Sequence, residues 1–331
     1  WLHEVVPASR SGLYFATEMS LVQLINIGLA LLLGFILQMG EGLGRFFVVY
    51  GLGIGVGLVS IAFIRRIPGG EARPQLSATA GGLAGYRPAL ADAAFLAYVG
   101  RALLGMVAAA ASAAASTLYL RDALGLADSR IMYLVSLGSL AVALTVRSWG
   151  EYADDRGTVP ALIQVLAAHS VAAALWLLLL PGTSWAPWLA VPVVMVSAVF
   201  NAAFLMLAAR GMLCRVRAEG RVGYTNIWIL GTALAMGLAP IAAGRAIDSW
   251  QLAGFRACFA ASSLVGLVAA LLFFGLRAEE GQPPVPRLAE VLRPSQPLRT
   301  LGRILWISLG LRGPSRPPHR DGRQGDQDVA S

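Results

Sequence analysis

Eight long apolar segments run through the chain, and the stretches between them carry most of its charge. An α-helix needs about 20 consecutive apolar residues to cross the hydrocarbon core of a bilayer. Only 13% of the 331 residues are charged, whereas soluble domains carry about 25%. No segment alternates with the two-residue period of a membrane β-barrel. The sequence therefore predicts an all-α, polytopic membrane protein with helices at about 15–38, 44–64, 93–120, 129–148, 158–180, 186–209, 223–245 and 254–276.

A short repeat indicates that the helices are organised in sixes. The segment 10–14 (Arg-Ser-Gly-Leu-Tyr) recurs loosely at 221–224 (Arg-Val-Gly-Tyr), and the two copies open the first and the seventh apolar segments. A chain with a six-helix period and eight segments would lack four helices at its start, and this chain begins at Trp1 instead of methionine. We therefore expect it to be the C-terminal two-thirds of a twelve-helix protein.

The basic residues are distributed unevenly along the chain. The net charge is +8 and all 26 basic residues are arginines. If the N-terminus is cytoplasmic, most arginines fall on the cytoplasmic side, as the positive-inside rule requires. Orientation thus explains the charge, and we expect no nucleic-acid partner. We expect a monomeric, multi-pass protein of the plasma membrane, with a bacterial inner membrane as its setting and both termini in the cytoplasm. The arginines placed outside are Arg45, Arg121, Arg130, Arg245 and Arg256.

Composition divides the chain into four parts. Residues 1–64 hold two helices, the remainder of an N-terminal half, and residues 65–91 form a cytoplasmic linker rich in Gly, Pro and Arg. Residues 92–277 form a C-terminal half of six helices. Residues 278–331 form a cytoplasmic tail, whose apolar stretch 298–311 is too short and too charged to span and is expected to lie on the membrane surface.

The most informative local sequence is Trp-Gly-Glu-Tyr-Ala-Asp-Asp-Arg-Gly-Thr-Val-Pro at 149–160, which we place in a cytoplasmic loop of about ten residues. Gly157 permits a tight turn, and Gly150 lets a neighbouring helix come close. Asp154 lies at the membrane surface and needs a partner. The positive N-terminal end of a helix on the same side would serve, and by the internal repeat this is the helix that starts near Tyr14.

The stretch resembles the loop motif of the major facilitator superfamily, whose pattern is G-x-x-x-D-R-x-G-R-R, often followed by proline. The segment 5–12 also resembles the loop that precedes helix five in that family. The resemblance covers residues 1 to about 277. The matching positions are Gly150, Asp154, Gly157 and Pro160, whereas Asp155 replaces an arginine, Arg156 comes one place late, and Thr158 and Val159 replace a basic pair.

The resemblance implies a conformational role for this motif. In the family, the contact of the motif aspartate bridges two halves on the cytoplasmic side and favours the outward-facing state. The alternative is that Asp154, Asp155 and Arg156 form a solvated loop that helps to set topology. Both interpretations remain open from the sequence, since a coupling role needs demonstrated two-state contacts.

Polar side chains within the spans are candidates for a substrate cavity, because they are costly in lipid and often functional. Asn201 lies near mid-membrane in the helix that the resemblance counts as tenth, a cavity-lining helix in the family, and Ser197 lies one turn away. Arg101 could attract an anionic substrate or could snorkel to the headgroups. Interhelical hydrogen bonds, worth about 0.6 kcal/mol each in membranes, are the alternative role for Asn201 and for the other uncharged side chains. The candidate set is Asn201, Ser197, Ser112, Ser116, Asn26, Gln23 and Arg101.

Titratable groups are scarce inside the predicted spans. His169 is central in the helix that the resemblance counts as ninth and peripheral, so a packing role is favoured over proton relay. No carboxylate lies mid-span, so a proton carrier would be Glu18 or would lie in the missing helices. Cys214 and Cys258 fall on opposite sides of the membrane and cannot pair.

These patterns predict a permease that moves a small solute by alternating access, with proton-coupled efflux as one form, and without a cofactor. Sparse charge in the spans favours a neutral or hydrophobic solute. An intramembrane transferase that holds Mg²⁺ on Asp154 and Asp155 is the alternative, although such a site needs further carboxylates and no second cluster follows on that side. If four helices are missing, the chain alone would be inactive.

Overall fold

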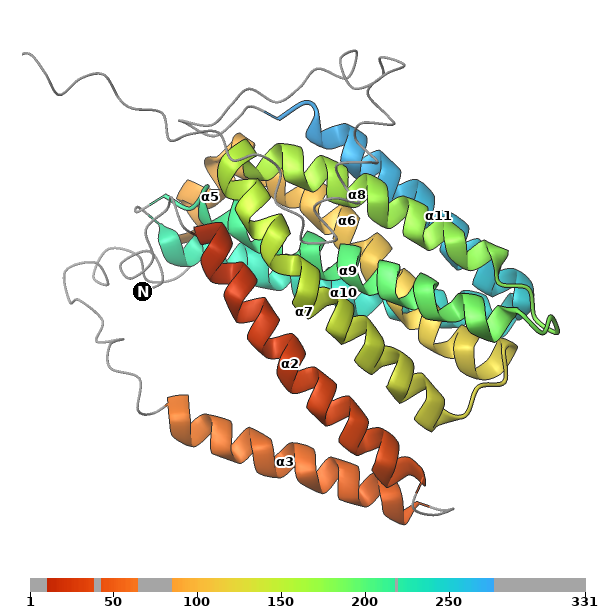
Figure 1. Ribbon diagram of the computed structural model, residues 1–331. Coiled ribbons are helices and arrows are strands. Elements are labelled where there is room, and N and C mark those ends of the chain that lie inside the picture. Colours follow the sequence, from red (N-terminus) through yellow and green to blue (C-terminus); the bar gives the residue numbers. More distant parts are fainter. Residues whose placement is uncertain (1–10, 39–42, 65–84, 218–219, 277–331) are drawn as a thin grey trace, which may run out of the picture.

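In the computed structural model the described part of the chain, residues 11–38, 43–64, 85–217 and 220–276, is built from helices and contains no strand (Figure 1). Eight of these helices are long and apolar enough to cross a membrane, as the sequence predicted. The predicted interfacial helix at 298–311 and most of the predicted linker lie outside the described residues. The elements are α2 (Ser11–Gln38), α3 (Gly44–Ile64), α5 (Arg87–Ala91), α6 (Ala93–Leu118), η3 (Tyr119–Ala123), α7 (Asp128–Arg156), α8 (Thr158–Leu175), η4 (Trp176–Leu178), α9 (Ala186–Leu213), α10 (Arg221–Trp250) and α11 (Leu252–Phe273).

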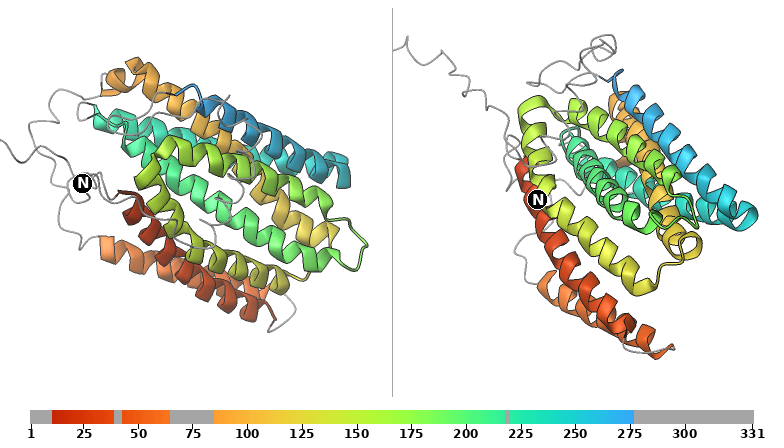
Figure 2. Two further views of the ribbon diagram at one scale, coloured as in Figure 1. Left: turned by 45° about the horizontal axis from the view of Figure 1, so that its top comes forward. Right: turned by 45° about the vertical axis from the view of Figure 1, so that its right-hand side comes forward.

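Helices α6 to α11 form one bundle, and α2 and α3 lie along one side of it (Figures 1 and 2). Within the bundle, α6 packs on α10 and α11, α8 packs on α9 and α11, and α7 packs on α9. Helix α2 runs antiparallel to α7 and contacts it over much of its length. At their far ends Gln38 Nε2 donates a hydrogen bond of 2.8 Å to Tyr133 Oη. The start of α2 therefore lies at the same end of the bundle as the last turn of α7.

The bundle has two ends, which we name by one residue each. The Asp154 end holds the C-termini of α7, α9 and α11 and the N-termini of α6, α8 and α10, and the Gln251 end holds the opposite termini. The described arginines gather at the Asp154 end, where Arg87, Arg147, Arg156, Arg210, Arg215, Arg217 and Arg221 lie. Arg121, Arg130 and Arg256 lie toward the Gln251 end, so the predicted charge asymmetry separates the two ends of the folded bundle.

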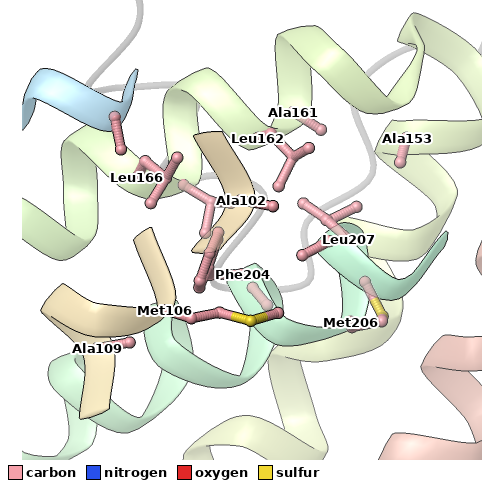
Figure 3. Close-up of a cluster of buried hydrophobic side chains, with 14 of the residues drawn as sticks. Ala102, Met106, Ala109, Ala153, Ala161, Leu162, Leu166, Phe204, Met206 and Leu207 are labelled. Atoms are coloured by element: carbon pink, nitrogen blue, oxygen red, sulfur yellow. The ribbon is translucent and has the colours of Figure 1, made fainter. Parts of the chain in front are cut away.

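Two apolar clusters fill the interior of the bundle. One lies toward the Asp154 end and is centred on α6, α8 and α9, where Phe204 packs beside Met106 and Leu166 (Figure 3). The other lies toward the Gln251 end, where the rings of Tyr119, Trp176 and Phe259 meet one another. These apolar contacts pack the helices of the bundle together. The polar groups of interest lie between the two clusters or at the ends of the bundle.

The outer surface of the bundle is apolar. Leu144 is 68% exposed and Trp188 is 79% exposed, and none of the described side chains of α3 is buried. An apolar surface this extensive would drive aggregation in water, but it is the surface that lipid tails require. The protein is therefore a multi-pass membrane protein.

The prediction that the motif at 149–160 lies in a loop of about ten residues is wrong. Helix α7 continues through the motif to Arg156, α8 begins at Thr158, and Gly157 alone separates them. Trp149 and Ala153 are buried within this extension, so tertiary packing holds the helix beyond the apolar window. Gly157 has φ 96° and ψ 153°, a conformation that only glycine adopts without strain, and this confirms the tight turn expected there.

Candidate functional site

A pocket of about 130 Å³ opens near the middle of the bundle, between α6, α7, α8 and α9. It brings together four residues that the sequence singled out, namely Ser112, Ser116, Ser197 and Asn201. Ser112 and Ser116 come from α6, and the other two come from α9. Spacing within each helix predicted that each pair would share a face. Only the folded bundle could place the two faces around one pocket.

His169 also lines this pocket, although the sequence favoured a packing role for it. Its side chain comes from the centre of α8 and only 2% of the residue is exposed. Neither Nδ1 nor Nε2 has a hydrogen-bond partner within the described part of the chain. A buried polar group without a partner is costly, so an imidazole left in this state next to a pocket is a candidate ligand contact. Its mid-span position was the one signal in the sequence that pointed to it.

The serine hydroxyls of the pocket all take part in hydrogen bonds within the protein. The hydroxyls of Ser112 and Ser116 donate to the carbonyls of Ala109 and Ala113, at 3.0 and 2.8 Å. Ser197 Oγ accepts a hydrogen bond of 3.0 Å from Trp176 Nε1. Their donors are thus committed within the protein, except for the hydroxyl proton of Ser197.

Asn201 keeps its whole amide available. The residue is half-buried in the pocket wall, and no hydrogen bond to its amide is formed within the described residues. An asparagine side chain carries one acceptor oxygen and a nitrogen with two donors. Asn201 and His169 therefore offer both donors and acceptors to the pocket, and none of their side-chain nitrogen or oxygen atoms is used within the described residues.

Three predicted cavity residues lie elsewhere. Gln23 and Asn26 are half-buried on α2 and do not line this pocket. Gln23 Nε2 contacts Met19 Sδ at 3.7 Å within its own helix. The side chain of Arg101 extends to the end of α11. There its Nη2 lies next to Gly275, at 3.6 Å from the position that a Cβ of this residue would occupy. Glu18, named as a possible proton carrier, is exposed on α2.

Asp154 forms a buried ion pair at the end of the bundle named after it. Arg210 Nη2 lies 2.7 Å from Asp154 Oδ1, and the side chains are 4% and 16% exposed. The pair connects the last turn of α7 to α9. From the sequence we expected the start of α2, which lies at this end of the bundle, to be the partner, and Arg210 was one of the arginines expected on the cytoplasmic side. The two residues that follow Asp154 in the motif, Asp155 and Arg156, are exposed.

A second acidic residue, Asp92, connects α6 to α10 at the same end. Its Oδ1 accepts a hydrogen bond of 3.0 Å from Phe95 N and caps α6. Its Oδ2 accepts a bond of 3.0 Å from Tyr224 Oη and pairs with Arg217 Nε at 3.0 Å. Burial by itself raises the pKa of Asp92, but these hydrogen bonds and the charge of Arg217 outweigh it, so the pKa lies below its ordinary value. The Asp before an apolar run is an N-cap signal that sequence analysis had not used.

The arrangement does not favour the alternative Mg²⁺ site. In the described part of the chain, no three His, Cys, Asp or Glu side chains gather closely enough to hold a metal ion. Asp154 is occupied by Arg210, and Asp155 is exposed beside it. Cys214 is exposed, Cys258 is buried, and neither forms a disulfide, as the sequence predicted.

A larger cavity of about 490 Å³ lies at the Gln251 end. Its lining includes Asp122 and Asp248 together with Pro181 and Phe255, and none of the residues predicted for the substrate cavity. The smaller pocket is the better candidate site because its unpartnered polar groups lie at mid-bundle.

Comparison with known proteins found no relative of this chain. No family model matches it, and no curated protein or solved structure matches it significantly.

Proposed function

We propose that the protein is a secondary transporter that works by alternating access, of the type that the motif resemblance implies. The observation that carries the proposal is the pocket at Asn201 and His169. Polar groups from α6, α8 and α9 converge there at mid-bundle, while the outer surface of the same helices is apolar. Substrate sites of secondary transporters likewise lie near the bilayer midplane and are lined by groups from several helices.

The ion pair at the Asp154 end supports a second part of the proposal, in which this end opens and closes. Asp154 and Arg210 link α7 to α9, and both helices also contribute to the pocket. The start of α2 lies at the same end, so a rearrangement of α2 against α7 would change the surroundings of the pair. In this proposal the intact pair stabilises the state in which the Asp154 end is closed.

Alternating access can be tested without knowing the substrate. Cys214→Ser and Cys258→Ala would remove the native thiols, and Asn201→Cys would place one thiol in the pocket. Oriented vesicles of each sidedness would then be treated with a membrane-impermeant maleimide. We expect Asn201→Cys to react from each side, because the pocket opens in turn to both.

Leu144→Cys is the matched control, because Leu144 faces outward on α7, where lipid should shield a thiol from both sides. Labelling of Asn201→Cys from one side only, or from neither, would overturn alternating access and leave a fixed pocket.

A further inference from the structure

We propose that the pocket at His169 binds one small, uncharged solute that carries both hydrogen-bond donors and acceptors, held by the imidazole of His169 and the amide of Asn201. This inference rests on the proposed function insofar as it names the class of solute that would be moved. The binding site itself does not require transport, and the experiment below separates the two.

The charge of the lining excludes an ion as the preferred ligand. Among the residues that the structure describes, no arginine, aspartate or glutamate lines the pocket, and His169 is the one titratable side chain in its wall. An ion moved into a site without a counter-charge loses several kcal/mol of hydration free energy that nothing replaces. One imidazole without carboxylate or thiolate neighbours also falls short of the three or four ligands that protein zinc sites supply. A neutral solute avoids both penalties.

The hydrogen-bonding groups define the chemistry of the solute. An uncharged imidazole offers one donor and one acceptor, and both nitrogens of His169 lack partners in the described part of the protein. Asn201 adds donors and an acceptor from a different helix. A hydrocarbon would leave all of these groups unsatisfied, at a cost of about 1–3 kcal/mol for each. A solute with hydroxyl or amide groups would satisfy them.

The volume sets the size of the solute. A protein cavity of about 150 Å³ holds one benzene molecule, so a pocket of about 130 Å³ suits a solute with a few non-hydrogen atoms. Apolar side chains, including those of Val135, Val194 and Trp176, complete the wall. These dimensions suit a short polyol or a small amide such as glycerol, urea or acetamide.

The experiment uses the imidazole as its own reporter. The sequence contains three histidines, His3, His169 and His319, so His3→Gln and His319→Gln leave His169 as the one ring to observe. The protein would be labelled with ¹⁵N-histidine, placed in lipid nanodiscs, and titrated with glycerol, urea and acetamide. Acetate and methylammonium serve as charged probes of similar size. We expect at least one neutral solute to shift the ring ¹⁵N signals saturably, and the charged probes to leave them unchanged.

Two amide substitutions provide a matched pair. Asn201→Leu removes the second anchor, and Asn26→Leu makes the same chemical change on α2, outside the pocket. We expect apparent affinity to fall about tenfold for Asn201→Leu, as expected for a lost hydrogen bond of roughly 1.5 kcal/mol, and to stay unchanged for Asn26→Leu. If Asn201→Leu does not fold, Asn201→Ala replaces it.

Each outcome decides the inference. No saturable response to any neutral solute, an equal response to the charged probes, or equal weakening by both substitutions would overturn it. If the thiol at position 201 is labelled from both sides while no neutral solute binds, transport stands and this solute class fails. If a neutral solute binds while labelling is one-sided, the site stands and transport fails.

Discussion

Asp154 and Asp155 are adjacent in sequence but lie in different environments in the folded protein. Asp154 lies at 2.7 Å from a buried guanidinium, and Asp155 is exposed. Exposed charges contribute little to stability, whereas removal of one partner from a buried pair leaves the other charge uncompensated. At the scale of single residues, environment and not residue type decides which carboxylate matters.

We predict that Asp154→Asn lowers the free energy of unfolding by about 3–5 kcal/mol, because Arg210 then remains buried without its counter-charge. Asp155→Asn, the matched control, should change it by about 0.5 kcal/mol or less. Thermal unfolding in detergent measures both, and transport should fall in the same order once a substrate is known. Arg210→Met added to Asp154→Asn should recover part of the loss. Equal unfolding of the two single variants would return the motif to a solvated, topological role.

At the scale of elements, Gly105 is one of the glycines that let α6 and α9 approach each other closely. A Cβ added to Gly105 would lie 2.6 Å from Phe204 Cζ and 3.0 Å from Leu166 Cδ2. Such contacts are shorter than van der Waals distance, so a methyl group there would push the helices apart or force Phe204 from its rotamer. The same helix carries Gly100, where an added Cβ meets nothing within 4 Å.

We predict that Gly105→Ala destabilises the bundle by about 1–3 kcal/mol through overpacking. Gly100→Ala should be neutral or slightly stabilising, since alanine favours a helix over glycine by about 1 kcal/mol. Unfolding of the two variants in the same detergent makes the comparison. A second substitution, Phe204→Leu, should relieve the clash in Gly105→Ala. If Gly105→Ala were as stable as Gly100→Ala, the close packing of α6 on α9 would be contradicted.

At the scale of the whole molecule, the two ends of the bundle differ in charge. Arginines concentrate at the Asp154 end, so the positive-inside rule predicts that this end faces the cytoplasm. Cys214 is exposed at that end, and Ser184 is exposed between η4 and α9 at the Gln251 end. These two positions can report orientation directly.

We predict that the native Cys214 reacts with an impermeant maleimide in inside-out vesicles and is protected in right-side-out vesicles. In a Cys214→Ser background, Ser184→Cys should show the reverse pattern, and the buried Cys258 should react slowly in both. Mass spectrometry of the labelled protein gives the extent at each site. The opposite sidedness would invert the topology, and with it the assignment of the Asp154 end to the cytoplasm.

The sequence by itself determined the class of the protein, the eight spans and the division of arginines between two ends. These follow from hydropathy and charge, which act on each segment independently of its neighbours. It also predicted that Ser112 with Ser116, and Ser197 with Asn201, share helix faces, because helical period is a local property.

The tertiary structure alone decided which groups meet. It joined two predicted faces around a pocket, added His169, placed Gln23, Asn26 and Arg101 outside that pocket, and gave Asp154 a partner in Arg210. It also extended α7 through a polar stretch that hydropathy had marked as a loop, since buried Trp149 and Ala153 stabilise the helix there. Partners separated by tens of residues depend on how helices pack against one another, and a periodicity read along one segment does not contain that information.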